Sequence, residues 1–139
     1  MTERELLQLA RAYHETLFPK TCPHCGRRFA SLREYIEVTR PVGRYMSYDV
    51  EAGDFAPRQL AGAIALANCP CGDTLALTTE GMPLAQRLEI LDWIRTESEQ
   101  RGVDPRELVA SFRDKVRDLV LAGEPALDVL LPPAHNSSC

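Results

Sequence analysis

The chain has 139 residues, of which 45% are apolar and 26% charged, and its formal net charge is −4 at pH 7. This length suits one domain with a moderate core, and the composition is typical of a soluble globular protein. No apolar run approaches the roughly 20 residues of a membrane-spanning helix, and the first residues lack the layout of a secretory signal. We therefore expect a cytoplasmic protein, in which paired cysteines hold metal or do redox chemistry more often than they form structural disulfides.

The N-terminal segment predicts an amphipathic helix from about Thr2 to Leu17. Thr2 and Glu5 form a capping box, in which the Thr2 hydroxyl accepts from the Glu5 backbone N–H. Pro19 limits the helix, because a proline biases the residue before it away from helical geometry. We interpret His14, inside this helix, as a surface residue and not as a metal ligand. The apolar stripe at helical spacing consists of Leu6, Leu9, Ala10, Tyr13 and Leu17.

A turn with two thiols follows, Cys22-Pro23-His24-Cys25-Gly26. Gly26 permits the positive φ that lets backbone N–H groups point at the two sulfurs. Pro23 stiffens the turn before any metal binds, which reduces the entropy lost on closure. His24 is an alternative ligand, but we expect it to point outward because two better ligands flank it.

The next segment favours a short helix. Ser31 and Glu34 form a second capping box, which predicts a helix through Ile36 or Val38. A strand is the competing interpretation, because Tyr35 and the apolar, β-branched residues after it favour sheets. We favour the helix because the capping box is a specific signal for a helix start.

Prolines and glycines punctuate residues 41–57, which predicts mostly irregular structure there. Within this segment, residues 45–50 have an alternating character and are a candidate strand. Asp49, Glu51 and Asp54 lack the spacing and the terminal glutamate of a calcium-binding loop. We therefore expect these three acidic side chains to lie in a solvated loop.

The clearest β signal spans residues 61–80. Leu75 and Leu77 alternate with small or polar residues, which is the period-two pattern of a half-buried strand. An apolar run over residues 60–67 forms the other arm, and its small side chains let another element pack closely. The sequence therefore predicts a β-hairpin with a second thiol turn at its tip. That turn reads Cys69-Pro70-Cys71-Gly72.

The segment of about residues 83–122 predicts an antiparallel helical hairpin. Gly102 ends the first helix, Asp104 is the N-cap of the second, and Gly123 ends that second helix. The tail, residues 124–139, is expected to be partly disordered. The expected buried stripes are Leu84, Leu88, Ile90, Leu91, Trp93 and Ile94 in the first helix, and Leu108, Val109, Phe112, Val116, Leu119 and Val120 in the second.

Four thiols in two turns match the tetrahedral shell of a structural zinc site. We therefore predict that one Zn²⁺ joins the two turns, and that no position in its shell is left for a catalytic water. Iron also suits four thiolates, and ordinary reduced cysteines are a further alternative. The predicted metal ligands are Cys22, Cys25, Cys69 and Cys71.

The two turns resemble the knuckles of zinc ribbons, in which Cys-Pro-x-Cys-Gly turns on two hairpins hold one metal. They are also similar to the uncharacterised bacterial CpXC-type proteins, which carry two Cys-Pro-x-Cys motifs. The resemblance covers the knuckles and the hairpin of residues 60–80, roughly a third of the chain. The second turn is one residue shorter than the usual pattern, which changes the angle between Cys69 and Cys71. The resemblance implies Zn²⁺ and a structural or interaction role, without catalytic activity.

Two other classes of function fit the same residues. A C-x-x-C and a C-x-C that hold zinc are the ligand set of the redox-switched chaperones, in which oxidation expels the metal, although there the C-x-C comes first. A nucleic-acid-associated zinc ribbon is the other class, because residues 20–44 carry six basic and two acidic side chains, a local charge of +4. The rest of the chain carries −8, and no stacking aromatics accompany the basic residues as single-strand binding requires.

No sequence pattern indicates an enzyme, since a nucleophile elbow, a glycine-rich phosphate loop and a paired His-Glu metal motif are all missing. Cys139 is a spare thiol, and His135 near it is interpreted as chance and not as an activating base. We expect one non-enzymatic α+β domain over residues 1–123, with a zinc-ribbon-like β-hairpin core at about residues 20–80 between the N-terminal helix and the C-terminal helical hairpin. The expected role is protein interaction or regulation. A protein partner, and a homodimer through the C-terminal helices, are the expected contacts, while nucleic acid is disfavoured and no membrane contact is expected.

Overall fold

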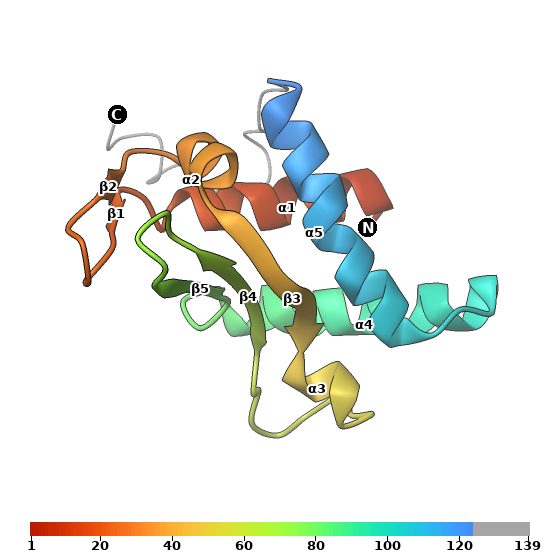
Figure 1. The fold of residues 1–139 in the computed structure, drawn as a ribbon. Helices are drawn as coiled ribbons and strands as arrows, with labels where there is room; N and C mark the ends of the chain where they lie inside the picture. Colours follow the sequence, from red (N-terminus) through yellow and green to blue (C-terminus); the bar gives the residue numbers. More distant parts are fainter. Residues whose placement is uncertain (124–139) are drawn as a thin grey trace.

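A computed structural model gives the fold, and it describes residues 1–123. It confirms the expected α+β class, with helices near both ends of this range and two antiparallel sheets between them, one of two strands and one of three (Figure 1). Cys139, His135 and the predicted tail lie outside the described residues. The elements in chain order are α1 (Glu3–Glu15), β1 (Lys20–Thr21), β2 (Arg28–Phe29), α2 (Leu32–Val38), β3 (Arg40–Ser47), α3 (Tyr48–Glu51), β4 (Ala63–Asn68), β5 (Thr74–Thr78), α4 (Leu84–Arg101) and α5 (Pro105–Leu121).

The N-terminal helix α1 forms where the capping box predicts it. The Glu5 backbone N–H donates to Thr2 Oγ1 at 3.1 Å, and acidic residues in the first turn favour the positive end of the helix dipole. The helix ends at Glu15, with Thr16 as its C-cap, and so stops two residues short of the expected Leu17. One face of α1 enters the core through Leu6, Leu7, Leu9 and Ala12.

The expectation that His14 lies at the surface of α1 is only partly right. Its side chain is half-buried, and its Nδ1 atom lies 2.7 Å from the carbonyl oxygen of Ala10. Because a carbonyl oxygen can only accept, Nδ1 carries the proton in this hydrogen bond. Burial lowers the pKa of His14, so the ring is favoured in its neutral form with a free Nε2 lone pair.

The segment between α1 and the larger sheet contains the first thiol turn and the helix α2. Strands β1 and β2 pair antiparallel on either side of the turn. Ser31 Oγ accepts from the Glu34 N–H at 3.1 Å, and Glu34 reaches back to the Ala30 N–H at 3.3 Å, which confirms the helix over the strand alternative. Phe29 and Tyr35 then pack edge to face, with ring centroids 5.3 Å apart.

The predicted β-hairpin is confirmed as strands β4 and β5. Strand β4 is central in the larger sheet, between β3 and β5. Ala65 lies opposite Leu77, and Ala67 lies opposite Leu75. Of these four residues, which share one face, Ala67, Leu75 and Leu77 are buried. This face is therefore the one that packs into the core.

Strand β3 pairs with β4 through a break in register, and an arginine of α5 contacts the break. The pairing shifts between Val42 and Met46. Arg113 donates from Nη1 to the Gly43 carbonyl oxygen at 3.2 Å and from Nη2 to the Leu66 carbonyl oxygen. A charged donor thus stabilises two backbone acceptors where the strand ladder is irregular.

The predicted strand at residues 45–50 is correct only for its first half. The strand β3 starts earlier than predicted, at Arg40, and it ends at Ser47. Ser47 Oγ accepts from the Val50 backbone N–H at 3.2 Å and caps the short helix α3. The hydroxyl N-cap therefore turns the chain into a helix where sequence alternation indicated more strand.

The prediction of a solvated acidic loop is wrong for one of its three residues. Asp49 is only 5% exposed, and its two carboxylate oxygens accept from the backbone N–H groups of Ala61 and Gly62, each at 2.9 Å. Glu51 and Asp54 are exposed, as expected. Asp49 is buried because it satisfies two backbone donors of the segment that leads into β4.

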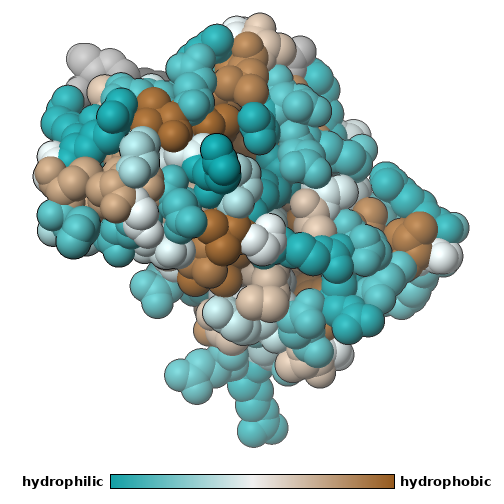
Figure 2. Space-filling model, in the orientation of Figure 1, coloured by the Kyte–Doolittle hydropathy of each residue, from teal (hydrophilic) through white to brown (hydrophobic). Residues whose placement is uncertain are grey.

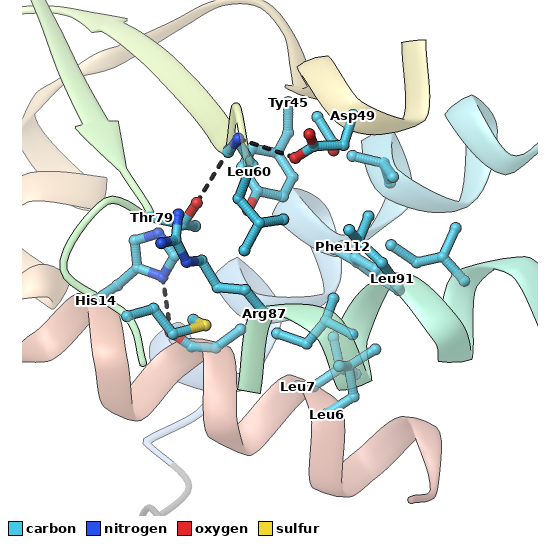
Figure 3. Close-up of a pocket in the computed structure, with 18 residues that line it drawn as sticks. Leu6, Leu7, His14, Tyr45, Asp49, Leu60, Thr79, Arg87, Leu91 and Phe112 are labelled. Carbon is cyan, nitrogen blue, oxygen red and sulfur yellow. Dashed lines mark hydrogen bonds between the residues drawn. The ribbon is translucent and has the colours of Figure 1, made fainter. Parts of the chain in front are cut away.

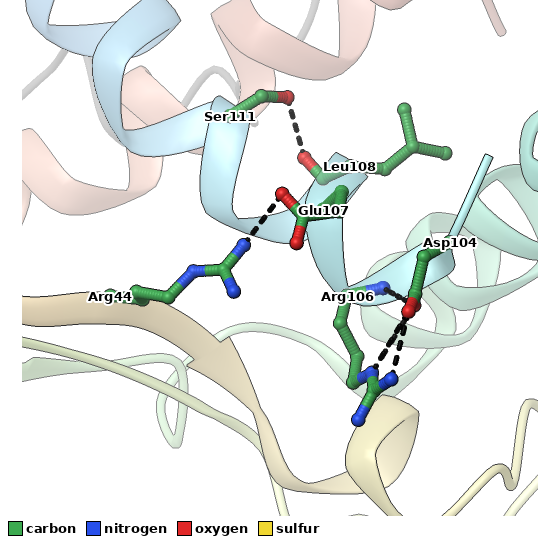
Figure 4. A network of polar contacts seen from close by, with 6 residues as sticks. All are labelled: Arg44, Asp104, Arg106, Glu107, Leu108 and Ser111. Atoms are coloured by element: carbon green, nitrogen blue, oxygen red, sulfur yellow. Dashed lines mark hydrogen bonds and ion pairs between the residues drawn. The ribbon is translucent and has the colours of Figure 1, made fainter.

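The two C-terminal helices α4 and α5 form as predicted, but they cross at a steep angle and are not antiparallel (Figure 1), and one residue of the predicted buried stripe is exposed. Gly102 ends α4 in the left-handed conformation, with φ of 65°. Asp104 caps α5 by accepting from the Arg106 backbone N–H at 2.9 Å (Figure 4). Leu84, at the very start of α4, is 58% exposed, whereas Met82 just ahead of the helix is buried. The residues of these two helices that enter the core of the single chain are Leu91, Trp93, Ile94, Leu108, Val109, Phe112 and Val120.

The buried apolar residues form two clusters. One, which we call the ribbon core, lies under the thiol turns and the sheet, and the other, the helical core, lies among α1, α4 and α5. Val116 of α5 packs against both clusters. The ribbon core contains Cys22, Phe29, Leu32, Tyr35, Ala67, Cys69, Leu75, Leu77 and Val120, and the helical core contains Leu6, Leu7, Val50, Leu91, Trp93, Ile94, Val109 and Phe112.

The surface of the described residues is mixed in character. On the face seen in Figure 2, apolar side chains form small groups that polar side chains separate. Large exposed apolar residues are scattered along the chain, as Met1, Tyr48, Leu84 and Val103 show. Within residues 1–123, no helix has the length and apolar character needed to cross a membrane.

Candidate metal centre

The two thiol turns lie next to each other at one end of the larger sheet (Figure 1), and their sulfur atoms converge. The Sγ atoms of Cys22 and Cys71 are 3.8 Å apart, and those of Cys25 and Cys69 are 3.7 Å apart. All four Sγ atoms lie within 4.8 Å of one another. Within residues 1–123, this is the one group of three or more His, Cys, Asp or Glu side chains arranged to hold a metal ion.

The backbone of the first turn holds its cysteines in place through two hydrogen bonds. The Cys22 N–H donates to the Arg27 carbonyl oxygen at 2.8 Å, and the Gly26 N–H donates to the Cys22 carbonyl oxygen at 2.9 Å. Gly26 has a φ of +79°, which residues with a side chain rarely adopt. The glycine that follows Cys25 therefore lets the turn close.

The second turn is one residue shorter and repeats the same pattern. The Cys69 N–H donates to the Asp73 carbonyl oxygen at 2.8 Å, and the Gly72 N–H donates to the Cys69 carbonyl oxygen at 2.8 Å. Gly72 has a φ of +96°. The missing residue tightens this turn, and Cys71 still lies in the cluster. The departure from the usual knuckle spacing thus leaves all four sulfurs within reach of one ion.

The two turns place their cysteines in the same way relative to the core. Cys22 is 0% exposed and Cys69 2% exposed, and both belong to the ribbon core. Cys25 and Cys71 are exposed. The first sulfur of each turn therefore anchors the cluster in the core, while the second faces solvent and gives ions and reagents access to it.

Backbone donors and neighbouring sulfurs set the protonation of the thiols. The Arg27 backbone N–H lowers the pKa of Cys25. At Cys71, the Asp73 backbone N–H also favours the thiolate, but desolvation and the other three sulfurs outweigh it and raise the pKa to about 12. At Cys69, the Cys71 backbone N–H lowers the pKa, but desolvation and the sulfurs of Cys25 and Cys22 outweigh it, so that the pKa is raised. Four thiolates this close repel one another, so a bound cation is needed for all four to be ionised together.

Comparisons with known proteins found no family model, no curated protein and no solved structure that matches this chain. The site is nevertheless zinc-ribbon-like by its own geometry, because two hairpin turns face each other across four sulfurs. Such a cluster is able to bind a metal ion.

Other residues near the cluster are only partly as expected. His24 is exposed and outside the cluster, as predicted. Asp73, which sequence reasoning missed, places its Oδ2 atom 3.8 Å from the Cys22 Sγ atom. Its position directly after the second Cys-Gly pair is the signal that would have found it. On the exposed side, the Arg27 guanidinium lies over the Phe29 ring at 5.8 Å from its centroid.

Proposed function

We propose that this protein is a small zinc-binding module of the zinc-ribbon, CpXC-like kind, with a structural site that its four clustered cysteines form. The sulfur geometry carries this proposal. A tetrahedral shell with Zn–S distances of about 2.3 Å places its sulfurs about 3.8 Å apart, and two of the four cross-turn separations are 3.7 and 3.8 Å. Four thiolate ligands favour zinc over cations that prefer oxygen ligands. Iron also accepts four thiolates and is the less favoured alternative.

The proposed ion acts as a cross-link and not as a catalyst. Four thiolates fill the shell, so neither a substrate nor a catalytic water has a position on the metal. The ion would join residues 22–25 to residues 69–71, two segments that the chain separates by β2, α2, β3, α3 and β4. Structural zinc sites contribute on the order of 10 kcal/mol to folding, which is enough to fix this junction.

Elemental analysis of protein purified without added metal tests the site. We expect about one zinc per chain by mass spectrometry of the metal content. Cys22→Ser and Cys71→Ser are expected to lose it, whereas Cys139→Ser, which changes the fifth cysteine of the sequence, is the matched control and should keep it. Stoichiometric iron with visible absorbance would overturn the choice of metal, and metal-free protein that is folded would overturn the site itself.

The proposed role is to present a surface to an acidic segment of a protein partner. Arg27 and Arg28 are exposed beside the metal centre, and neither forms an ion pair with another of the described residues. The net charge of −4 opposes general binding to nucleic acid. Charge complementarity with an acidic protein surface is therefore the favoured contact.

A pair of charge reversals tests this contact. We expect a partner captured by the wild type to be lost with the double variant Arg27→Glu, Arg28→Glu. Arg58→Glu, which changes an exposed arginine in the loop before β4, is the control and should retain the partner. Capture that nuclease treatment abolishes would instead indicate nucleic acid, and capture that is equal for all three proteins would show that the contact lies elsewhere.

A redox-responsive zinc-thiolate switch is the second candidate. The observation that favours it is the exposure of Cys25 and Cys71, which leaves one thiolate of each turn open to oxidants. On this hypothesis, mild peroxide releases the zinc stoichiometrically and exposes apolar surface to a fluorescent dye. Zinc that is retained under peroxide, with the fold intact, excludes the switch while leaving the structural site in place.

A further inference from the structure

A pocket separate from the metal centre lies among α1, β3, α3, α4, α5 and the start of β4 (Figure 3). Its volume is about 60 Å³, which is several times the roughly 10–15 Å³ that one water molecule requires. His14 and Arg87 line the pocket and are half-buried, so it is not sealed from solvent. Its walls are mainly apolar and include Leu6, Leu7, Ile90, Leu91 and Phe112.

The unusual group in this pocket is the guanidinium of Arg87. Its Nε atom is buried and has no hydrogen-bond partner among the described residues. Figure 3 shows the side chain reaching from α4 so that the guanidinium lies between His14 and Thr79. No carboxylate of the described residues pairs with this guanidinium, because none of their ion pairs includes Arg87. A buried cationic donor without a partner is costly, and an anion bound in the pocket would remove that cost.

Two neighbouring groups are suited to an anion beside Arg87. Thr79 Oγ1 already accepts from the Ala63 backbone N–H at 3.0 Å, so its own hydroxyl proton remains available to donate. His14 uses Nδ1 on the Ala10 carbonyl oxygen at 2.7 Å. Its pKa is lowered by burial, so the ring adds no charge that competes with Arg87 for the anion.

Asp49 lines the same pocket and carries the opposite charge, but its carboxylate is already hydrogen-bonded to the backbone. Its two oxygens accept from the backbone N–H groups of Ala61 and Gly62, each at 2.9 Å. In Figure 3 it lies on the other side of Leu60 from the Arg87 guanidinium. A negatively charged head group is therefore favoured on the Thr79 side of the pocket, away from the Asp49 carboxylate.

We infer that this pocket binds a small monocarboxylate with a short, branched apolar chain. The carboxylate pairs with Arg87 and accepts from the Thr79 hydroxyl. The chain fills the apolar part of the pocket, against Leu7, Leu91 and Phe112. A charged head and an apolar tail match the unpaired Arg87 guanidinium and the apolar walls of the pocket, and a volume of about 60 Å³ limits the buried apolar part of the ligand to a few carbon atoms.

Three matched small molecules test the head group. In ¹⁵N–¹H correlation spectra of the full-length, metal-loaded protein, 3-methylbutanoate should give saturable shifts of the Gly62 and Thr79 amides. The alcohol 3-methyl-1-butanol, which lacks the charge, should bind at least about tenfold more weakly. Valine adds an ammonium group to the same carbon skeleton and should also bind more weakly. Equal or tighter binding of the alcohol or of valine would overturn the monocarboxylate assignment, as would shifts that do not saturate.

A matched pair of variants tests the role of Arg87. Arg87→Met keeps an unbranched apolar stem in place of the arginine stem and removes the charged guanidinium, and it should weaken the binding of 3-methylbutanoate about tenfold or more. Arg95→Met is the control, because Arg95 lies on the same helix but pairs with Asp92 at 2.7 Å and Glu99 at 3.4 Å on the exposed face. The control should bind as the wild type does. Equal affinity in both variants would contradict the inference.

The thermal stability of the ligand-free protein gives an independent test. Because Arg87 has no partner in the pocket, Arg87→Met should melt at the same temperature as the wild type or roughly 3 °C higher. The ligand should raise the melting temperature of the wild type and leave that of Arg87→Met unchanged. If Arg87→Met instead melts several degrees lower without ligand, the guanidinium stabilises the free chain, and its assignment to a ligand is wrong.

Discussion

The ribbon core and the helical core are stabilised in different ways. Two residues of the ribbon core, Cys22 and Cys69, are also members of the metal cluster, and the strands β1 and β2 beside it have two residues each. The helical core contains no cysteine. Its largest side chains pack directly on each other, with the Trp93 and Phe112 rings 5.7 Å apart.

The difference indicates which part of the chain a bound metal ion would stabilise. A hairpin with two-residue strands makes few ladder hydrogen bonds and buries little apolar surface, so it is not stable alone. The metal ion proposed for the four cysteines would supply that missing stability at one point. The helices α4 and α5, with 18 and 17 residues, bury long apolar stripes and need no such ion. The two cores should therefore respond differently to the same perturbation.

Loss of the metal is expected to have the largest effect, and to act on one core. In Cys22→Ser, or in the wild type treated with a strong chelator, hydrogen exchange should show loss of protection in residues 28–29 and 74–78. The amides of residues 91–94 and 108–112 should stay protected. The physical reason is that the metal contributes on the order of 10 kcal/mol to the ribbon region only. Simultaneous loss of protection in both regions would show that the two cores unfold as one unit.

The reverse perturbation is Phe112→Ala in the helical core. Phe112 is 5% exposed, and truncation of a buried phenylalanine typically costs about 3–5 kcal/mol. We expect a loss of that size in urea unfolding, while the folded fraction keeps its zinc. Ser111→Ala is the control, since the Ser111 hydroxyl only donates to the Leu108 carbonyl oxygen within α5 (Figure 4). Zinc loss from folded Phe112→Ala would mean that the helical core supports the metal centre.

Much of this fold could be predicted because local signals determine it. The hydroxyl and carboxylate caps at Thr2, Ser31 and Asp104 each act within three residues of the chain, and all three mark helix starts in the structure. The thiol turns are also local, since Gly26 and Gly72 close them. Their convergence is a long-range event, but the preference of a metal for four sulfurs makes it readable from the sequence.

The features that the sequence did not reveal depend on contacts between distant residues. Asp49 is buried because backbone donors 12 and 13 residues later need an acceptor. Arg113 contacts the Gly43 carbonyl oxygen across 70 residues, and no local pattern marks either partner. The pocket around Arg87 likewise forms only when six elements have packed together. An isolated charge in a sequence is most simply interpreted as solvated, and only the tertiary structure shows which charges are buried.

Arg113 tests how strongly the two cores are joined. It reaches from α5 to backbone acceptors in β3 and β4, and its pKa is lowered because it is partly buried. Replacement by Met removes both hydrogen bonds from a charged donor, so we expect a loss of about 1–3 kcal/mol in urea unfolding. Arg113→Lys should recover part of it, because one donor can still reach a carbonyl oxygen. A loss below about 0.5 kcal/mol in Arg113→Met would show that the register break needs no support.

Arg44 and Glu107 form the exposed counterpart of that junction and should have the smallest effect. Arg44 Nη2 lies 2.8 Å from Glu107 Oε2, again between β3 and α5 (Figure 4). Their side chains are 58% and 64% exposed, so water and salt screen the pair. A double-mutant cycle with Arg44→Met and Glu107→Gln should give a coupling of about 0.2–1 kcal/mol that decreases at high salt. A coupling as large as the effect of Arg113→Met would mean that burial does not distinguish the two contacts, and that charge alone holds α5 against the sheet.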